Sequence, residues 1–127
     1  MNDSLRIHTA LVLRLEWLAV LAASVIAYGV FGFSWLWFAV LILAPDLSML
    51  GYLKGLRVGA FTYNLVHTLI APAVLALAAW WLAMPWLAAL ALILLAHIAA
   101  DRALGYGLKY ATGFKDTHLG RIGRDDA

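Results

Sequence analysis

Two polar stretches interrupt an otherwise apolar part of this sequence: Tyr63-Asn64-Leu65-Val66-His67-Thr68 and His97-Ile98-Ala99-Ala100-Asp101-Arg102. A charged or imidazole side chain inside a membrane is costly unless it is paired, bound to a ligand or in contact with water. Such side chains therefore mark a candidate functional site. We expect the two stretches to belong to one transmembrane hairpin, which brings their polar side chains together.

The composition is that of an integral membrane protein. Hydrophobic residues make up 65% of the 127 residues, and the mean hydropathy is +0.90, whereas soluble domains contain about 45–50% apolar residues. A chain of this length is expected to form a single domain, residues 1–127. The net charge of +2 is too small to indicate a nucleic acid as partner. Because the chain has no cysteine, a metal ion would be held by His, Asp, Glu or backbone oxygen atoms.

The Asp, Glu, Lys and Arg residues are confined to three segments, 1–16, 46–57 and 101–127. The charge-free runs between them, 17–45 and 58–100, are each too long for one crossing of the bilayer, which takes about 20 residues. Each run therefore predicts a pair of helices joined by a short turn. The predicted fold class is all-α, an integral membrane four-helix up-down bundle.

The four helices are expected at about residues 11–31, 34–50, 60–82 and 86–108, followed by a basic cytoplasmic tail at 109–127. In this arrangement the three charged segments, with all nine Lys and Arg residues, lie on one side of the membrane. The positive-inside rule then places both termini in the cytoplasm. The sequence thus predicts a multi-pass protein of the bacterial cytoplasmic (inner) membrane.

Five ligand-type side chains are expected at one depth in the cytoplasmic leaflet, although they come from four different helices. They are Glu16, Asp46, His67, His97 and Asp101. His97 and Asp101 share a helix face, so either the carboxylate orients the imidazole or both bind one metal ion. Two imidazoles and three carboxylates match the ligands of Zn, Mn or Fe sites. A polar network that only fixes the packing of the helices is an equally open interpretation.

Further polar and cationic side chains near this layer are candidates for binding a substrate: Asn64, Arg102, Lys109 and Lys54. The cationic ones could hold an anionic lipid headgroup. The basic tail could lie on such headgroups, or it could fold back as a lid that supplies His118 or Lys115 to the polar layer.

Four motifs carry a resemblance to a known family; they cover residues 45–52, 63–68, 97–110 and 112–120. From Arg14 onward the chain closely resembles a family of small bacterial membrane proteins of unknown function, domain-of-unknown-function family 4260. This resemblance supports the membrane fold and implies no activity.

A looser resemblance concerns the order of the polar residues. Pro-Asp at 45–46, His-Thr at 67–68 and His-x-x-x-Asp at 97–101 look like the membrane-bound metal-dependent hydrolases of bacterial inner membranes. This resemblance implies that Asp46, His67, His97 and Asp101 are metal ligands. The chain departs from that pattern at Ser48, where a second carboxylate is expected.

The enzyme hypothesis is the hydrolysis of a phosphate or ester bond in a lipid-like substrate. In this hypothesis a metal ion activates water, Glu16 acts as a base or an additional ligand, and Asp46 is also part of the catalytic machinery.

Two other hypotheses stay open. The protein could be a non-enzymatic scaffold, as a homo-oligomer or as a subunit of a larger membrane complex. It could also bind haem or a chlorophyll-type pigment through His67 and His97, although three nearby carboxylates suit a tetrapyrrole poorly.

Overall fold

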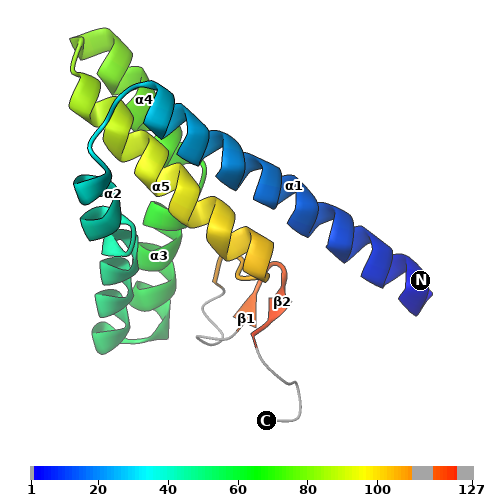
Figure 1. Ribbon diagram of the computed structural model, residues 1–127. Coiled ribbons are helices and arrows are strands. Elements are labelled where there is room, and N and C mark those ends of the chain that lie inside the picture. The colour runs from blue at the N-terminus through cyan, green and yellow to red at the C-terminus, as the bar shows by residue number, and fades with distance from the viewer. Residues whose placement is uncertain (1, 110–115, 123–127) are drawn as a thin grey trace.

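The computed structural model describes residues 2–109 and 116–122. This part of the chain is all-α apart from one short antiparallel hairpin (Figure 1). The elements are the α-helices α1 (Asp3–Val30), α2 (Trp35–Leu41), α3 (Leu56–His67), α4 (Ile70–Leu82) and α5 (Pro85–Leu104), the 3₁₀ helix η1 (Ala44–Lys54), and the strands β1 (Asp116–Thr117) and β2 (Gly120–Arg121).

Several helices are long and apolar enough to cross a membrane. Among the described residues these are α1, the combined segment Trp35–Lys54 and α5, with α3 and α4 as a fourth span if the bent pair is counted as one. Large apolar side chains cover their outer surfaces: Val30 and Trp80, for example, are each 78% exposed. Such a surface is suited to contact with lipid. The all-α prediction is confirmed, as is the presence of helices that can span a membrane.

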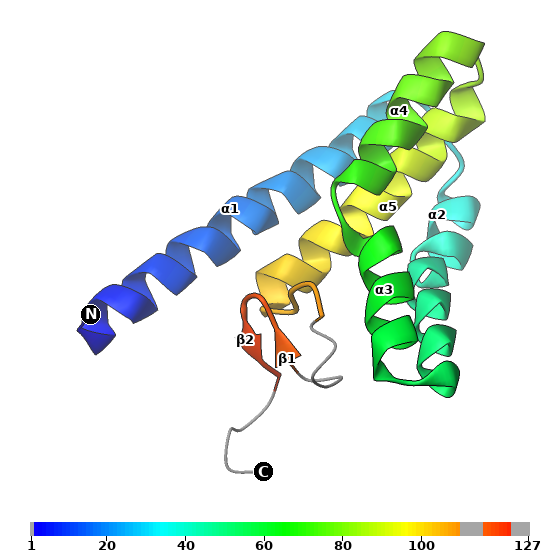
Figure 2. The same ribbon diagram turned by 180° about the vertical axis from the view of Figure 1, so that it is seen from behind.

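Helix α5 is the central element of the fold. Helices α1 and α4 both pack along it, and α3 packs against η1 (Figures 1 and 2). The N-terminus, the η1–α3 connection and the end of α5 lie toward one end of the molecule. The α1–α2 and α4–α5 connections lie toward the other end. The charged segments and the uncharged turns therefore gather at opposite ends.

The outer two predicted helices have different ends from those expected. The first begins at Asp3 rather than near residue 11, because the Asn2 side chain caps it by accepting a hydrogen bond from the Ser4 amide at 2.8 Å. The last ends at Leu104 rather than near residue 108. Gly105 follows it with a φ of 93°, a left-handed conformation that favours glycine and ends a helix.

The inner two predicted helices are each broken. The segment predicted at 34–50 divides into α2 and η1, and Pro45 lies in the first turn of η1. The segment predicted at 60–82 divides into α3 and α4, which meet at 45°. Pro72 lies in the first turn of α4, where a missing amide hydrogen is tolerated. Proline thus explains both breaks, and both breaks lie beside the polar residues that the sequence singles out.

Two glycines allow η1 and α3 to approach closely. A Cβ atom added to Gly59 would lie 2.1 Å from the ring of Tyr52, and one added to Gly51 would lie 2.1 Å from the hydroxyl of Thr62. That hydroxyl donates a hydrogen bond of 2.7 Å to the carbonyl of Ser48. Helix α3 therefore fixes the position of η1, which carries Asp46.

We predict that Gly59→Ala destabilises the protein by about 1–3 kcal/mol, the usual cost of overpacking a tight contact. Unfolding of the full chain in detergent would measure this loss. In a Tyr52→Ala background the same substitution should cost much less, because the ring that it meets is gone. An equal cost in both backgrounds would contradict the proposed contact.

Candidate metal centre

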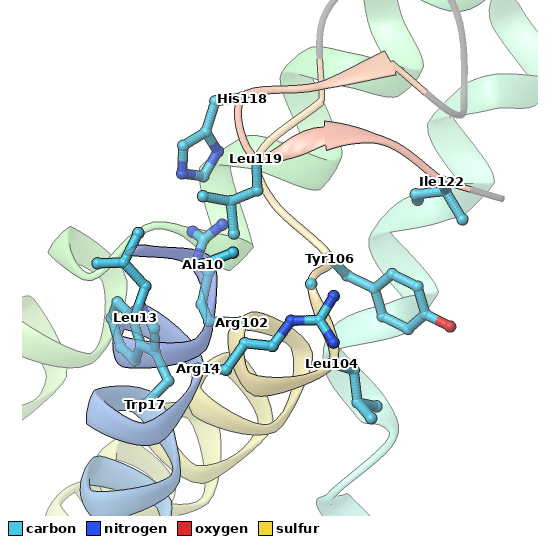
Figure 3. Close-up of a pocket in the computed structure, with 11 residues that line it drawn as sticks. Ala10, Leu13, Arg14, Trp17, Arg102, Leu104, Tyr106, His118, Leu119 and Ile122 are labelled. Carbon is cyan, nitrogen blue, oxygen red and sulfur yellow. The ribbon is translucent and has the colours of Figure 1, made fainter. Parts of the chain in front are cut away.

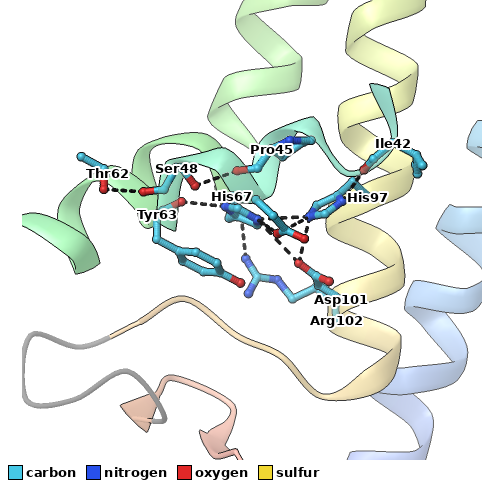
Figure 4. Close-up of polar contacts among 10 residues, drawn as sticks. Ile42, Pro45, Ser48, Thr62, Tyr63, His67, His97, Asp101 and Arg102 are labelled. Atoms are coloured by element: carbon cyan, nitrogen blue, oxygen red, sulfur yellow. Dashed lines mark hydrogen bonds and ion pairs between the residues drawn. The ribbon is translucent and has the colours of Figure 1, made fainter. Parts of the chain in front are cut away.

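Four side chains from three elements converge at one point in the inner part of the protein. Asp46 comes from η1, His67 is the last residue of α3, and His97 and Asp101 lie one turn apart on α5. One ligand atom from each lies within 4.8 Å of all the others. Figure 4 shows the two imidazoles directed toward one another, with the carboxylate of Asp101 beside them. These are four of the five residues that the sequence predicts at one depth.

The distances between the ligand atoms are short enough for the four side chains to hold one metal ion. The Nε2 atoms of His67 and His97 are 3.2 Å apart, and they lie 3.3 Å and 3.1 Å from Oδ1 of Asp46. The same two atoms lie 3.7 Å and 3.3 Å from Oδ2 of Asp101. Zinc bonds of about 2.0–2.2 Å to nitrogen and oxygen place tetrahedral ligands about 3.3–3.6 Å apart. Five of the six separations among the four ligand atoms are therefore close to these values, and the sixth, between Asp46 and Asp101, is at most 4.8 Å.

The backbone fixes the tautomer of both imidazoles. Nδ1 of His67 lies 2.8 Å from the carbonyl oxygen of Tyr63, and Nδ1 of His97 lies 2.6 Å from that of Ile42. A carbonyl oxygen can only accept, so each Nδ1 carries the hydrogen. In the neutral ring, Nε2 then presents a free electron pair toward the centre. An outer hydrogen bond of this kind is usual for metal-binding histidines.

The helix breaks create these two carbonyl contacts and the position of His67. The Asp46 amide donates to the carbonyl of Leu43 and not to that of Ile42, which an uninterrupted α-helix would use. The Ile42 carbonyl is therefore available to His97. At the end of α3, the carbonyl of His67 accepts a 3.0 Å hydrogen bond from Arg102, which satisfies a group that the bend would leave without a partner.

The imidazoles are buried, whereas the carboxylates reach a small cavity. His67 is 2% exposed and His97 4%, but the Asp46 side chain is 39% exposed and that of Asp101 20%. The cavity has a volume of about 240 Å³, and both carboxylates line it together with Lys109. The site thus has a closed histidine side and an accessible carboxylate side.

The structure places the other predicted site residues in different roles. Glu16 is exposed on α1 and is not part of the four-residue group. Lys54 is exposed at the far end of η1 from Asp46. The Asn64 amide holds the backbone of Lys109 through two hydrogen bonds of 2.7 Å. Arg102 lies beside the centre and donates to the carbonyl of His67.

Lys109 is the predicted substrate-binding residue that lines one cavity together with both carboxylates. It is only 4% exposed, and its Nζ atom lies 4.7 Å from the centre of the Tyr63 ring. Burial lowers the pKa of Lys109, while Asp101 and Asp46 act in the opposite direction. The ammonium group is thus held in a partly apolar setting near the candidate centre.

One contributor to the site was not predicted as such. The Tyr63 ring stacks on His67, with ring centres 3.8 Å apart and planes 8° apart. The spacing of four between Tyr63 and His67 was a usable signal for this contact.

His118, which the sequence offered as a residue that the tail could supply to the polar layer, does not join the four-residue group. Its Nδ1 accepts a 2.7 Å hydrogen bond from the Leu108 amide, and Gly107 leaves room for its ring. Lys115, the other such residue, lies outside the described residues.

The Nε2–Nε2 distance of 3.2 Å argues against the pigment hypothesis. A tetrapyrrole held between two axial histidines would have to pass between the two rings, and this arrangement leaves no space for it. Two carboxylate oxygens also point at the same centre. The donor set suits a small cation instead.

Comparison with known proteins gives one match. The family model described as Domain of unknown function (DUF4260) matches residues 10–122. No curated protein and no solved structure matches the chain.

We predict that acid releases the β1–β2 hairpin from the end of α5. Partial burial and the nearby Arg102 lower the pKa of His118 from its ordinary 6.5. The hydrogen bond between the Leu108 amide and His118 therefore contributes fully to the stability of the folded hairpin above that pH. As the pH falls below about 6.5, a proton competes for Nδ1 and the bond to the Leu108 amide is lost. Hydrogen-exchange protection of that amide should therefore be lower at about pH 5 than at about pH 7.5.

His118→Gln is the matched control, because its side-chain oxygen can accept the same hydrogen bond but does not titrate. The protection of the Leu108 amide should then be independent of pH. An unchanged pH dependence in the variant would show that another group controls the hairpin.

Proposed function

Because the chain belongs to the family described as Domain of unknown function (DUF4260), whose description gives no activity, we propose a function from the site itself. The protein is a membrane-embedded hydrolase that holds one divalent metal ion with Asp46, His67, His97 and Asp101. Its substrate is a lipid-like molecule, and the bond that it cleaves is a phosphate or carboxylic ester.

One observation carries the metal part of the proposal. Four electron-pair donors meet within 4.8 Å, and both imidazoles already use their hydrogen on a backbone carbonyl. Bare nitrogen and oxygen atoms at such distances repel one another unless a cation lies between them. A divalent ion would also balance the two negative charges of the aspartates in a low-dielectric setting.

The donor set favours zinc among the predicted metals. Two imidazole nitrogens and two carboxylate oxygens are acceptable to Zn, Mn and Fe. Five of the six separations are 3.1–3.7 Å, close to those of a four-coordinate tetrahedron, the arrangement most typical of zinc. An octahedral ion would need further oxygen ligands from water or substrate.

The accessible carboxylates favour catalysis over a purely structural site. Structural zinc sites are closed by four protein ligands, whereas catalytic sites keep one position for water or substrate. Asp46 is the ligand best placed to leave the metal ion and open a position for water or substrate. It is the most exposed of the four and lies in the first turn of the short helix η1. A metal ion there would polarise the substrate and lower the pKa of water.

In the hydrolytic step proposed here, the oxygen of a water molecule in the cavity bonds to the phosphorus or carbonyl carbon of the substrate. The water proton passes to a carboxylate oxygen of Asp46. The bond to the leaving oxygen breaks, and that oxygen takes up the proton from Asp46, which returns the carboxylate to its ionised form. Lys109, which lines the same cavity, provides positive charge for the anion that develops.

A lipid-like substrate follows from the location proposed for the site. The centre lies where a span is broken, and irregular backbone at membrane depth is tolerated mainly where it lines a protein interior or a cavity. The concentration of Lys and Arg in the charged segments supports a bacterial inner-membrane protein with cytoplasmic termini, four spans and a site in the cytoplasmic leaflet.

We predict about one bound zinc ion per chain in the purified protein, measured by mass spectrometry of the metal content. His67→Ala and Asp101→Asn should each reduce bound metal to below about a tenth, because each removes a ligand atom. His8→Ala and Glu16→Gln are matched controls, since both residues are exposed on α1 outside the group. These controls should keep their metal.

Hydrolysis of lipid phosphates and esters should depend on the same residues as metal binding. A parent protein that stays metal-free in excess zinc would sink the metal proposal and leave the four side chains as a proton-bearing packing network. A parent that binds zinc but cleaves none of the screened lipids, while His67→Ala only destabilises the fold, would instead identify a structural site.

A further inference from the structure

We propose that a second cavity, next to the metal centre, binds the phosphate of an anionic lipid headgroup. This headgroup cavity lies between α1, the end of α5 and the β1–β2 hairpin. The claim that this cavity anchors the lipid substrate rests on the proposed function. The claim that it binds an anionic lipid does not, because it is argued from the residues of the cavity alone.

The headgroup cavity combines cationic and apolar walls. Its volume is about 710 Å³, and Arg14, Arg102 and His118 line it together with Leu13, Trp17 and Leu119. Figure 3 shows these side chains around one space, with α1 on one side and the hairpin on the other. Its walls therefore offer both an anion-binding part and an acyl- or glycerol-binding part.

Arg14, Arg102 and His118 can each donate hydrogen bonds to an anion. Among the described residues no Asp or Glu lines the cavity, and no ion pair or hydrogen bond involves the Arg14 guanidinium. Arg102 uses one nitrogen on the carbonyl of His67, and a guanidinium has five N–H groups. His118 accepts at Nδ1, so its neutral ring carries a donor at Nε2. Two guanidinium groups and an imidazole donor suit a phosphate.

The apolar walls indicate an amphiphile and not a soluble anion. The indole of Trp17 lies beneath Arg102, whose Cζ is 6.0 Å from the ring centre. Leu13, 42% exposed, projects from the same helix, and α1 carries further exposed apolar side chains such as Leu11 and Leu18. The cavity also lies at the end of the molecule where the charged segments gather, the level at which lipid phosphates occur.

Two residues connect the headgroup cavity to the metal centre. Tyr106 and Ile122 line both this cavity and the smaller one that contains the carboxylates of Asp46 and Asp101. Arg102 also connects them, since it follows Asp101 in the chain and binds the carbonyl of His67. A lipid whose phosphate lies in the first cavity would thus reach the second with the adjoining part of its headgroup.

The test uses the full chain in a neutral detergent and measures binding of dihexanoyl phosphatidic acid by titration calorimetry. Dihexanoyl phosphatidylcholine and inorganic phosphate are the comparison probes. We expect saturable binding of phosphatidic acid that Arg14→Gln weakens at least about tenfold. Arg6→Gln is the matched control, because it removes the same charge from an exposed position on the same helix. This control should bind like the parent.

Equal weakening by both substitutions would overturn the proposal, because it would show a general attraction to charge. Equal binding of phosphatidylcholine would also overturn it. Inorganic phosphate that binds as tightly as the lipid, with the same dependence on Arg14, would overturn the lipid assignment in favour of a soluble phosphate.

Metal content measured on the same samples separates this proposal from the proposed function. Arg14→Gln should keep its zinc, because Arg14 is not one of the four ligands. Arg14-dependent lipid binding by a metal-free parent would support the headgroup cavity and remove its role as a substrate site. Zinc binding without any lipid binding would overturn the headgroup cavity and leave the metal centre standing.

Discussion

The cost of burying imidazoles and carboxylates among apolar helices is the constraint on which the rest of this structure depends. His67 and His97 are almost fully enclosed, so each polar atom of their rings needs a partner. Backbone carbonyls supply one partner to each ring. The remaining nitrogens and the two carboxylates meet at a single point, where one cation would satisfy all four. The stability of the inner part of the bundle is thus tied to what occupies that point.

The breaks in the helices serve this requirement. An uninterrupted second span would engage the carbonyl of Ile42 in its own helix and leave Nδ1 of His97 without an acceptor. An uninterrupted third span would give Arg102 no free carbonyl at His67. Each break exposes a backbone group, and a side chain of α5 takes it up. The prolines, the kinks and the candidate site are therefore one feature of the fold.

This feature also explains what the sequence could and could not reveal. The confinement of charge to three segments was sufficient to predict apolar helices that gather those segments at one end. Helical spacing and depth were sufficient to group Asp46 with two histidines. Depth alone, however, does not tell which way a side chain points from its helix. Glu16 was therefore grouped with the four site residues, although it is exposed on α1 and lies outside their group. Pro45 and Pro72 mark the helix breaks locally. No local pattern, however, records that His97 and Arg102 of α5 bind the carbonyls that the breaks free. The contact between His118 and Leu108 likewise depends on how the chain folds back after Gly105.

Charge balance suggests why cationic residues surround the centre without joining it. A divalent ion with two aspartates and two neutral imidazoles has no net charge, which is the least costly state in a low-dielectric interior. Such a centre does not attract an anionic substrate over a distance. The attraction would have to come from elsewhere, and Arg14, Arg102 and Lys109 would provide it from the walls of the two cavities. Within the described residues, neither Arg14 nor Arg102 forms an ion pair with Asp46 or Asp101. With the proposed ligands and the cations in separate positions, one short chain would be able to hold a metal ion and a negatively charged lipid side by side.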